Sequence, residues 1–401
     1  MRLKSKSIQN LLKLFLATPV LVLMTACGGG GGGTGGGSNS GGGSNSGGNS
    51  SNPVLVGYVF SSLGGTTSPE TTYSNAVYSN GTVKTISSAL GGTEANATAK
   101  AVNSGGTYTY KTDYSGRQIL AYSINPSTGT LTQIAGITGL ASNPLPCFVD
   151  QSNKYLYVGF ANGTILSYSI GTNGTLTATG YSYSLPSASG YQVTSLTEDT
   201  TGTYLVAGAA NSTSTFGIYL LSENGNGSLF FVNDQIDISG GSLNLTPDPN
   251  TTNGNFVFGG GSGNFITVNI TELAAGSTSA VNVFSTGGTS LWGGVYWIDP
   301  TGTWLYGVVF DSSNSTSTLY QYEIGSTGQL TPGTMSSLNF GTFIPGPNIT
   351  TSYNKNLGFV IGPYRNNVSP IALFSFSSAT GQLSFVGGGG SGAPSSFASI
   401  N

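Results

Sequence analysis

The sequence predicts an all-β protein, a seven-bladed β-propeller of four-stranded antiparallel blades. A unit of two apolar strands followed by a glycine-leucine turn recurs along most of the chain. Charged residues make up only 6% of the 401 residues, whereas glycine alone contributes 64, a composition typical of β proteins with many tight turns. The end of the chain resembles a single strand, and the first repeat lacks such a strand. Together these observations favour a closed ring of similar blades.

The repeat is marked by a Gly-x-Leu element. It occurs at Gly129-Thr130-Leu131, Gly174-Thr175-Leu176, Gly227-Ser228-Leu229, Gly328-Gln329-Leu330 and Gly381-Gln382-Leu383, with a weaker copy at Gly81-Thr82-Val83. A degenerate copy near Val281 fills the double interval between Leu229 and Leu330. Seven copies between Val83 and Leu383 give a period of about 50 residues, which is a blade length rather than a solenoid repeat.

The third repeat shows the expected strands of one blade most clearly. They are 145–150 as the innermost strand, 155–160 as the second, 165–170 as the third and 175–179 as the outermost. Asn162-Gly163 and Asn173-Gly174 separate the last three strands, and Asn-Gly is a strong hairpin signal because both residues tolerate positive φ. Successive strands should therefore run antiparallel.

An aspartate recurs at the turn between the first and second strands of a blade, at Asp150, Asp199 and Asp299. An Asp at such a turn normally accepts hydrogen bonds from backbone amides, so a structural role is favoured over metal binding or catalysis. Cys147 lies in an apolar strand and is expected to be a buried, inert thiol, because the chain has no His to activate it.

The two ends of the folded body are expected to complete one blade together. The first repeat begins with 55–60, which matches a second strand and has no inner strand before it. Residues 394–401 match an inner strand with nothing after it. If the last strand completes the first blade, the ring closes and no unpaired edge is left at the seam.

Residues 1–26 have the pattern of a signal peptide. Four basic residues precede the apolar run 14–24, which is too short to span a bilayer comfortably. Residues 23–27 resemble the bacterial lipobox, so Cys27 is the expected lipidation site, as in palmitate-bearing lipoproteins. The alternative is an ordinary signal peptide with an incidental cysteine.

Residues 27–52 form a Gly/Ser/Asn-rich tether, and 53–401 form the propeller body. A coil of about 25 residues has a root-mean-square reach of roughly 25–30 Å. Gly28 stands where lipoproteins retained in the inner membrane carry Asp. The resemblance to lipoproteins therefore implies an outer-membrane protein of the bacterial cell envelope, facing either the periplasm or the cell surface.

Charge and residue types narrow the function. The whole chain carries a net charge of −3; without the four basic residues of the signal, 7 of the 11 basic residues oppose 14 acidic ones, a net charge of −7. A nucleic-acid partner is disfavoured by this balance. Metal sites built on His, Ser-His-Asp triads and Cys-His pairs are excluded because the chain contains no His. No cofactor or metal is expected.

The blade pattern resembles that of the lactonase-type propellers, whose namesake is 6-phosphogluconolactonase. Segments 150–176 and 299–330 carry the Asp, the turn glycine, the apolar Tyr-containing strands and the Gly-x-Leu turn of that family. The resemblance implies lactone hydrolysis or lactonisation at one end of the central channel by Arg, His and Glu side chains. This chain departs from the pattern, since it has no His and its body has only two arginines, so no catalytic residue is assigned.

In propellers, the loops between second and third strands share one face with the loops that enter the inner strands. Both arginines of the body fall on these loops. The candidate ligand-binding residues on this face are Arg117, Asp113, Asp311, Trp292, Tyr364 and Arg365. The alternative is that these residues are simply the charged and polar side chains that loops normally expose.

Three functions are compatible with the sequence. The first is an envelope-anchored binding or scaffold module, attached to the membrane through Cys27, that binds a glycan, a peptide or an envelope protein. The second is a His-free lactonase or other hydrolase acting at the channel mouth. The third is a structural surface or adhesion protein. An enzyme should concentrate carboxylates and Arg in one place, whereas a glycan or peptide binder should show aromatic residues with Asn and Ser.

Overall fold

A computed structural model covers the chain, which divides into two units, Met1–Ser51 and Asn52–Asn401. The structure describes residues 53–399 except 66–67, 91–99, 187–189, 212–214, 240–243, 251–253, 262–263, 286–290, 300, 312–315, 334–337, 340–349, 355–356, 362–370, 378 and 390–392. All of these residues belong to the second unit, the propeller body. The predicted signal peptide, Cys27 and the tether lie outside the described residues.

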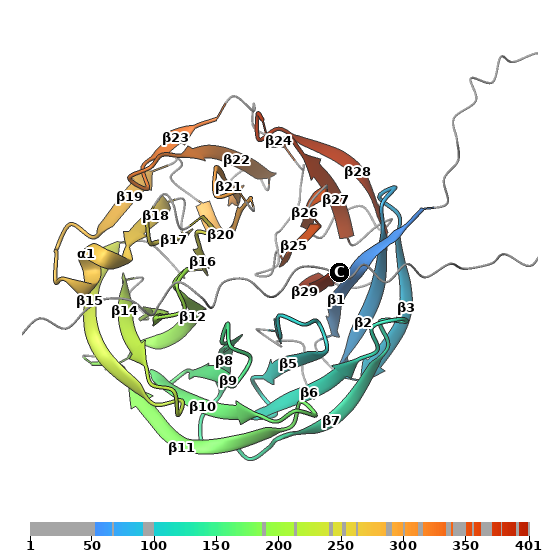
Figure 1. Cartoon of the computed structure of the whole chain (residues 1–401), viewed down its shortest axis with the longest axis horizontal. Coiled ribbons are helices and arrows are strands. Elements are labelled where there is room, and N and C mark those ends of the chain that lie inside the picture. Colours follow the sequence, from blue (N-terminus) through green and yellow to red (C-terminus); the bar gives the residue numbers. More distant parts are fainter. Residues whose placement is uncertain are drawn as a thin grey trace, which may run out of the picture. The chain divides into compact units, whose positions relative to one another are not determined.

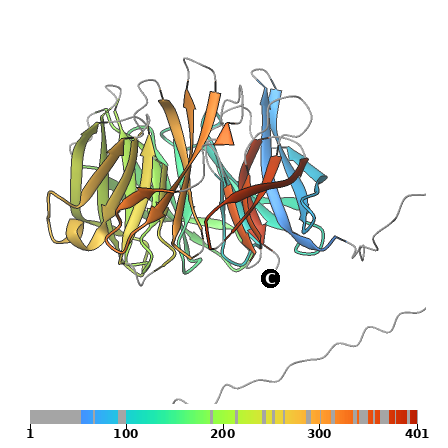
Figure 2. The ribbon, with the colours of Figure 1, turned by 90° about the horizontal axis from the view of Figure 1, so that it is seen from above.

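The body consists of antiparallel sheets that follow one another in chain order around a ring (Figure 1). Seen edge-on, their strands run between two faces (Figure 2). The second blade comprises β4 (Lys100–Val102), β5 (Tyr108–Asp113), β6 (Gln118–Ile124) and β7 (Leu131–Ile137); the third comprises β8 (Pro144–Val149), β9 (Tyr155–Phe160), β10 (Thr164–Ile170) and β11 (Leu176–Ser184). The fourth comprises β12 (Gln192–Glu198), β13 (Tyr204–Ala210), β14 (Thr215–Glu223) and β15 (Leu229–Ser239); the fifth comprises β16 (Asn244–Pro247), β17 (Phe256–Gly261), β18 (Asn264–Asn269) and β19 (Val281–Ser285).

The sixth blade is a five-stranded sheet. It contains β20 (Leu291–Ile298), β21 (Trp304–Asp311), β22 (Thr316–Ile324) and β23 (Leu330–Pro332), with β24 (Leu338–Asn339) also paired to β22. The first blade contains β1 (Leu55–Gly65), β2 (Ser68–Tyr78), β3 (Val83–Leu90) and the last strand of the chain, β29 (Ala393–Ser399). The predicted strands of the third repeat are confirmed, although β11 continues beyond the expected end to Ser184.

The prediction of seven blades is wrong, because the described residues form six sheets of four or more strands. The strands expected as a further blade are divided. β25 (Thr350–Asn354) and β26 (Leu357–Ile361) form a two-stranded sheet, whereas β27 (Ile371–Phe376) and β28 (Leu383–Gly389) join the first sheet through a parallel bridge between Gly389 and Val83. This approach is close enough that a Cβ on Gly387 would lie 2.6 Å from the carbonyl oxygen of Gly81. Glycine at the end of β28 therefore lets that hairpin reach the first sheet.

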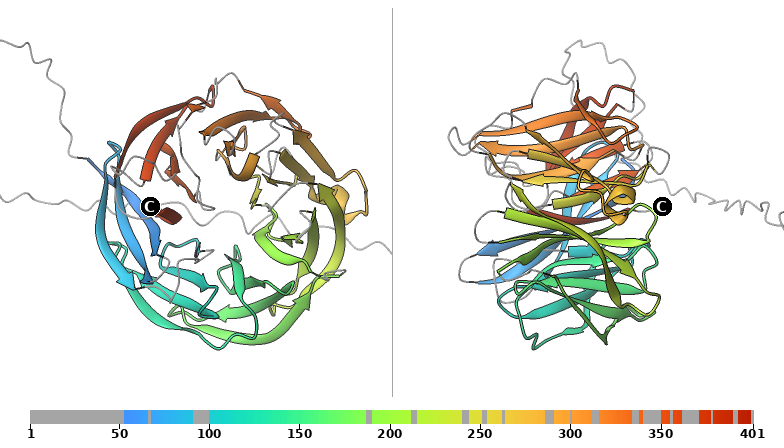
Figure 3. Two further views of the ribbon diagram at one scale, coloured as in Figure 1. Left: turned by 180° about the vertical axis from the view of Figure 1, so that it is seen from behind. Right: turned by 90° about the vertical axis from the view of Figure 1, so that its left-hand side faces the viewer.

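Closure of the ring through the C-terminal strand is confirmed. β29 pairs antiparallel with β1, and Val59 lies opposite Phe397 in the register. β1 pairs with β2 on its other side, so β1 has a hydrogen-bonded neighbour along both edges. Figure 3 shows the same arrangement from behind, with the first and last strands side by side.

The Gly-x-Leu repeat has a physical reason that lies between blades. Gly174 has φ +78°, and a Cβ there would lie less than 3.0 Å from ring carbons of Tyr108 in the preceding blade. The same contact joins Gly129 to Tyr58, Gly227 to Tyr155, Gly328 to Phe256, and Gly381 to Trp304. Glycine is required here because it adopts positive φ and leaves room for the ring. Each such turn thus fits one blade to the next.

The degenerate repeat near Val281 is explained by a short helix. α1 (Ile270–Ala274) occupies the place of the outer turn in the fifth blade, and Asn269 caps it by accepting a hydrogen bond from the Glu272 amide. Val281 is the first residue of β19. The helix lies beside β15 and β18 at the rim of the ring (Figure 3).

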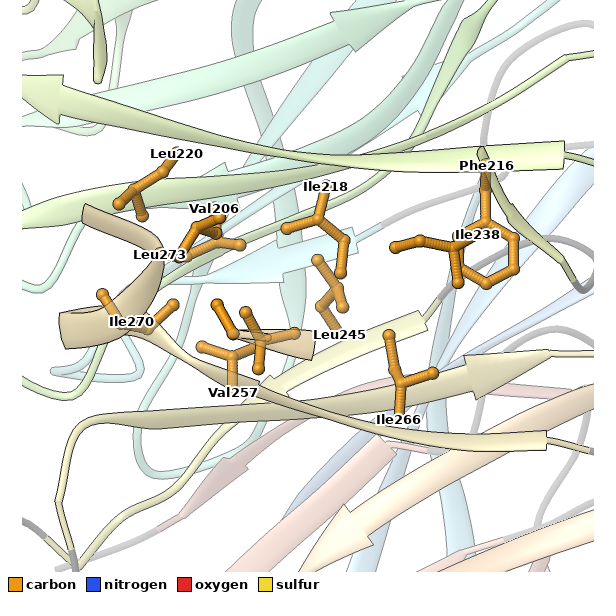
Figure 4. Close-up of a cluster of buried hydrophobic side chains, with 12 residues drawn as sticks. Val206, Phe216, Ile218, Leu220, Ile238, Leu245, Val257, Ile266, Ile270 and Leu273 are labelled. Carbon is orange, nitrogen blue, oxygen red and sulfur yellow. The ribbon is translucent and has the colours of Figure 1, made fainter. Parts of the chain in front are cut away.

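The hydrophobic core lies between neighbouring blades. Between the fourth and fifth blades, Phe216 and Ile218 on β14 pack with Val257 on β17 and Ile266 on β18, and Leu273 of α1 completes the cluster (Figure 4). Burying an aliphatic or aromatic side chain of this kind contributes about 1.5–3 kcal/mol. The blades are therefore joined by side-chain packing as well as by the closing strand.

Candidate functional site: a cavity between the third and fourth blades

The recurring aspartates organise the turns between first and second strands, as predicted. Asp150 Oδ1 accepts a hydrogen bond from the amide of Tyr155 at 2.7 Å. Asp199 Oδ1 accepts from the amide of Tyr204 at 2.7 Å, and Asp299 bonds the equivalent amides of its own turn. A buried carboxylate with several amide donors holds a turn in one conformation.

Neighbouring turns on this face also bond to one another. Gln151 Nε2 donates to the carbonyl oxygen of Asp199 at 2.8 Å, and Thr200 Oγ1 donates to the carbonyl oxygen of Asp248 at 2.5 Å. Asp248 is a fourth turn aspartate that the sequence pattern missed. Burial and then the charge of Asp299 raise its pKa to about 6. The face is therefore a continuous belt of polar turns rather than a set of independent loops.

A cavity of about 410 Å³ opens in this belt, and we call it the inter-blade cavity. It is formed by the β8–β9 turn of the third blade and by the β12–β13 and β14–β15 turns of the fourth. Its lining residues are Asp150, Gln151, Ser152, Lys154, Tyr155, Glu198, Thr201, Gly202, Glu223, Asn224 and Gly225. Tyr155 Oη donates to the carbonyl oxygen of Gly225 at 2.8 Å, which joins the two blades beside the cavity.

Two carboxyl groups, Glu198 and Glu223, meet in this cavity. Glu198 is the last residue of β12 and Glu223 the last of β14. Because β13 runs antiparallel between them, both strands end at the same edge of the sheet. Glu198 Oε2 accepts from the amide of Gln151 at 2.8 Å, and Glu223 Oε2 accepts from Tyr157 Oη at 3.0 Å. The two carboxyl groups are also hydrogen-bonded to each other.

This pair holds a proton far above the usual range of a carboxyl group. Burial, followed by the charge of Glu198, raises the pKa of Glu223 to about 8. Burial also raises the pKa of Glu198, while the Gln151 amide acts in the opposite direction. Burial and the charge of Glu223 raise the pKa of the Tyr157 hydroxyl. Two carboxyls at hydrogen-bond distance cannot both ionise easily, so one proton is shared between them at neutral pH.

Glu223→Gln is expected to change how stability depends on pH. The native state keeps its proton up to a pKa of about 8, whereas an unfolded Glu releases it at its ordinary pKa of 4.5. Between these values the native state binds more protons than the unfolded state, so the free energy of unfolding falls as pH rises. Gln cannot ionise, so the free energy of unfolding of the variant should rise relative to that of the native chain by about 4 kcal/mol between pH 4.5 and pH 8.

Denaturant unfolding at a series of pH values measures this gain. Glu323→Gln is the matched control, because Glu323 is an exposed residue of β22 in the sixth blade. For this control, the free energy of unfolding should change with pH in the same way as for the native chain. If the free energy of unfolding of Glu223→Gln also changes with pH as that of the native chain does, the two carboxyl groups do not share a proton.

The residues that the sequence singled out for ligand binding lie elsewhere. Asp113 is buried, and its Oδ1 accepts from the amide of Gly116 at 2.9 Å within the β5–β6 turn. Arg117 is exposed on the same turn, and its Nε donates to Asn143 Oδ1 at 3.2 Å. This turn is at the end of the second blade opposite to the face that carries the cavity.

Trp292 and Asp311 are at one end of the β20–β21 pair, where Trp292 faces Phe310 and Asp311 faces Leu291 in the register. Tyr364 and Arg365 lie outside the described residues. The structure therefore brings Asp113 close to Arg117 in one turn, and Trp292 close to Asp311 in another. A ligand-binding role for this set stays a prediction.

Sequence reasoning missed the Glu198–Glu223 pair. The two residues are 25 positions apart, and the intervening strand places them together only because β12, β13 and β14 pair in this register. The available signal was that each Glu ends an apolar segment of the fourth repeat. Combined with antiparallel pairing, that position puts both carboxyls at one edge.

Comparisons with known proteins give the fold but no close relative in sequence. No family model matches the chain, and no curated protein matches it significantly. A candidate 6-phosphogluconolactonase from Bacteroides fragilis is similar in structure, with a TM-score of 0.68 and 15% identity over 86% of this chain and 98% of that one. The likeness supports the β-propeller fold of the body.

Two further solved structures resemble this propeller. A periplasmic gluconolactonase from Pseudomonas aeruginosa has a TM-score of 0.64 and 15% identity, covering 86% of this chain and 99% of that one. A protein from Lactobacillus plantarum has a TM-score of 0.65 and 15% identity, covering 87% and 100%. At this identity the likeness concerns the fold alone.

Two other structural features are absent from the described residues. The described parts of 53–399 contain no cluster of three or more His, Cys, Asp or Glu residues suited to a metal ion. Among the same described residues, no helix is both long enough and apolar enough to cross a membrane.

Proposed function

We propose that this chain is an envelope-anchored lipoprotein whose lactonase-like propeller binds a small polar ligand in the inter-blade cavity. The observation that carries the proposal is the cavity itself. Its volume of about 410 Å³ lies within the range of roughly 300–1,000 Å³ typical of small-molecule sites. Three turns from two blades surround it with hydroxyl, amide, ammonium and carboxyl groups, which are suited to recognition of a polar molecule.

Binding is favoured over glycoside hydrolysis by the geometry of the carboxyl pair. Glycosidases hold their two carboxyls roughly 5–9.5 Å apart so that a sugar or water fits between them. Glu198 and Glu223 instead bond directly to each other. A His-free hydrolase is the second candidate, since two carboxyls that share a proton can also activate water. Turnover of simple lactones or esters that disappears in Glu223→Gln would favour this second candidate.

A cavity-filling variant tests the binding proposal. Asn224 is exposed and lines the cavity, so Asn224→Trp should fill it without displacing core side chains. The native chain is expected to gain thermal stability from at least one member of a panel of sugars, amino sugars, sugar acids and amino-acid derivatives, because a ligand that binds only the folded state stabilises it. Asn224→Trp should lose that gain.

Ser127→Trp is the matched control, because Ser127 is an exposed residue in the corresponding β6–β7 turn of the second blade. This variant should keep the response of the native chain. A ligand retained equally by both variants binds elsewhere. In that case Arg117→Ala and Trp292→Ala become the informative substitutions, since the sequence places those residues on the opposite face.

The membrane anchor is tested at Cys27. The order of signal, lipobox and flexible tether supports lipidation there. Cys27→Ala is therefore expected to release the protein from the membrane fraction or to block its maturation. Detergent partition and incorporation of labelled palmitate measure the effect. Native protein that stays in the aqueous phase without lipid label would overturn the anchor.

A further inference from the structure

We propose that the ligand of the inter-blade cavity carries a primary ammonium group, which takes the place of the proton between Glu198 and Glu223. This inference rests on the proposed binding function and names the chemical class of the ligand. It concerns a small organic cation, such as a lysine-like or amino-sugar group. Three properties of the pair support it: burial, unused acceptor atoms and the sign of the surrounding charges.

Glu198 is buried and Glu223 is partly buried, and both residues line the cavity. The Glu198 side chain is only 2% exposed. The Oε1 atom of Glu223 is inaccessible to solvent and has no hydrogen-bond partner from a donor group of the chain. Buried polar atoms are normally satisfied, so an unsatisfied carboxylate oxygen beside a cavity points to a donor that the ligand supplies.

The donors present are too few for two carboxylates. Two ionised carboxyl groups offer about eight acceptor positions. The chain supplies the Gln151 amide to Glu198 and the Tyr157 hydroxyl to Glu223. A primary ammonium has three N–H donors and a positive charge, and charge-assisted hydrogen bonds to carboxylates are about twice as strong as neutral ones.

The charges that face the pair also favour a cation. Asp150 on the β8–β9 turn and Asp199 on the β12–β13 turn both disfavour ionisation of Glu198. Among the described residues that line the cavity, Lys154 is the single basic side chain, against the carboxyl groups of Asp150, Glu198 and Glu223. A site of this sign attracts cations and repels sugar acids and phosphates.

Binding of the ammonium group releases one proton from the carboxyl pair. In the free protein the pair carries one proton and one negative charge. When the ammonium enters, the O–H···O bond between the carboxyls is replaced by N–H···O bonds, and the proton passes to the buffer. The pair then carries two negative charges, one of which the ammonium neutralises. Binding should therefore be linked to pH with one proton released.

The experiment uses the full chain and two probes of nearly the same shape. Nα-acetyl-lysine methylamide carries the ammonium, and Nα-acetyl-norleucine methylamide is its neutral counterpart. Titration calorimetry at pH 6, 7.5 and 9 gives both affinity and proton release. The lysine ammonium stays charged throughout, because its ordinary pKa is about 10.4.

The lysine probe is expected to bind at least about tenfold more tightly than the norleucine probe at pH 9. Its affinity should rise by about tenfold per pH unit below the pKa of the pair, near 8, and level off above it. Glu223→Gln should weaken the lysine probe at pH 9 and flatten its pH dependence. Glu323→Gln, the exposed control, should leave both unchanged, and Asn224→Trp should abolish binding.

The outcomes separate this inference from the proposed function. Equal affinity for the two probes, or lysine-probe binding that is independent of pH, overturns the ammonium site while the cavity remains a binding site. The ammonium site is also overturned if neither probe binds and another compound of the panel binds in a manner sensitive to Asn224→Trp. If no compound of the panel binds, both proposals fail.

Discussion

Removal of the last strand, β29, is expected to abolish the soluble folded protein. β29 covers the inner edge of β1, where it pairs through residues 57–62. Without it, β1 exposes a row of unpaired amides and carbonyls next to Val59 and Phe60, which are fully buried in the intact body. Such an edge pairs readily with other chains, so deletion of residues 393–401 should give aggregated protein.

Solubility on expression and size-exclusion chromatography measure this effect. Deletion of residues 400–401 alone is the matched control, since it shortens the chain but leaves β29 intact. The control should elute and melt like the full chain. If the longer deletion also remains soluble and melts at the native temperature, the closing pair does not hold the ring together.

Closure of the ring was predictable because the sequence shows one strand missing from the first repeat and one extra strand at the end of the chain. The first repeat lacks an inner strand and the last residues offer one, so a single pairing satisfies both. The strands of the third blade were predictable for a related reason. Alternating apolar residues fix the strands, and the Asn-Gly turns at Gly163 and Gly174 fix where they end, since both glycines have positive φ.

The number of blades was not predictable from the repeat. The repeat predicts the strands of each unit. Which strands join into one sheet depends on how closely their backbones approach, and the repeat does not give that distance. The end of β28 reaches the first sheet at Val83 because Gly387 carries no side chain that would press against the Gly81 backbone. That contact joins segments about 300 residues apart, which a period of 50 residues does not encode.

The candidate site was not predictable for a similar reason. Asp150 and Asp199 were found because each acts within its own turn, where side chain and amide are five residues apart. Glu198 and Glu223 act on each other across an intervening strand, and the raised pKa of Glu223 comes first from burial. Burial and register are properties of the assembled blade, so no short motif reports them.

Gly174→Ala is expected to destabilise the body by about 2–5 kcal/mol. Two costs combine at this position. An L residue at φ +78° is strained by about 1–2 kcal/mol, and a Cβ would press into the ring of Tyr108, which costs about 1–3 kcal/mol more. The contact joins the second and third blades, where Tyr110 Oη also donates to the carbonyl oxygen of Gly174 at 3.0 Å. Denaturant unfolding measures the loss.

Gly180→Ala is the control that separates the two costs. Gly180 has φ +82°, but nothing lies within 4 Å of the position that its Cβ would take. It should therefore show only the conformational cost of about 1–2 kcal/mol. Tyr108→Ala combined with Gly174→Ala should be less destabilising than the sum of the single changes, because the second substitution has no ring left to displace. Equal losses for Gly174→Ala and Gly180→Ala would mean that the ring contact contributes nothing. The glycine of the repeat would then be required for its backbone conformation alone, rather than for fitting each blade to the next.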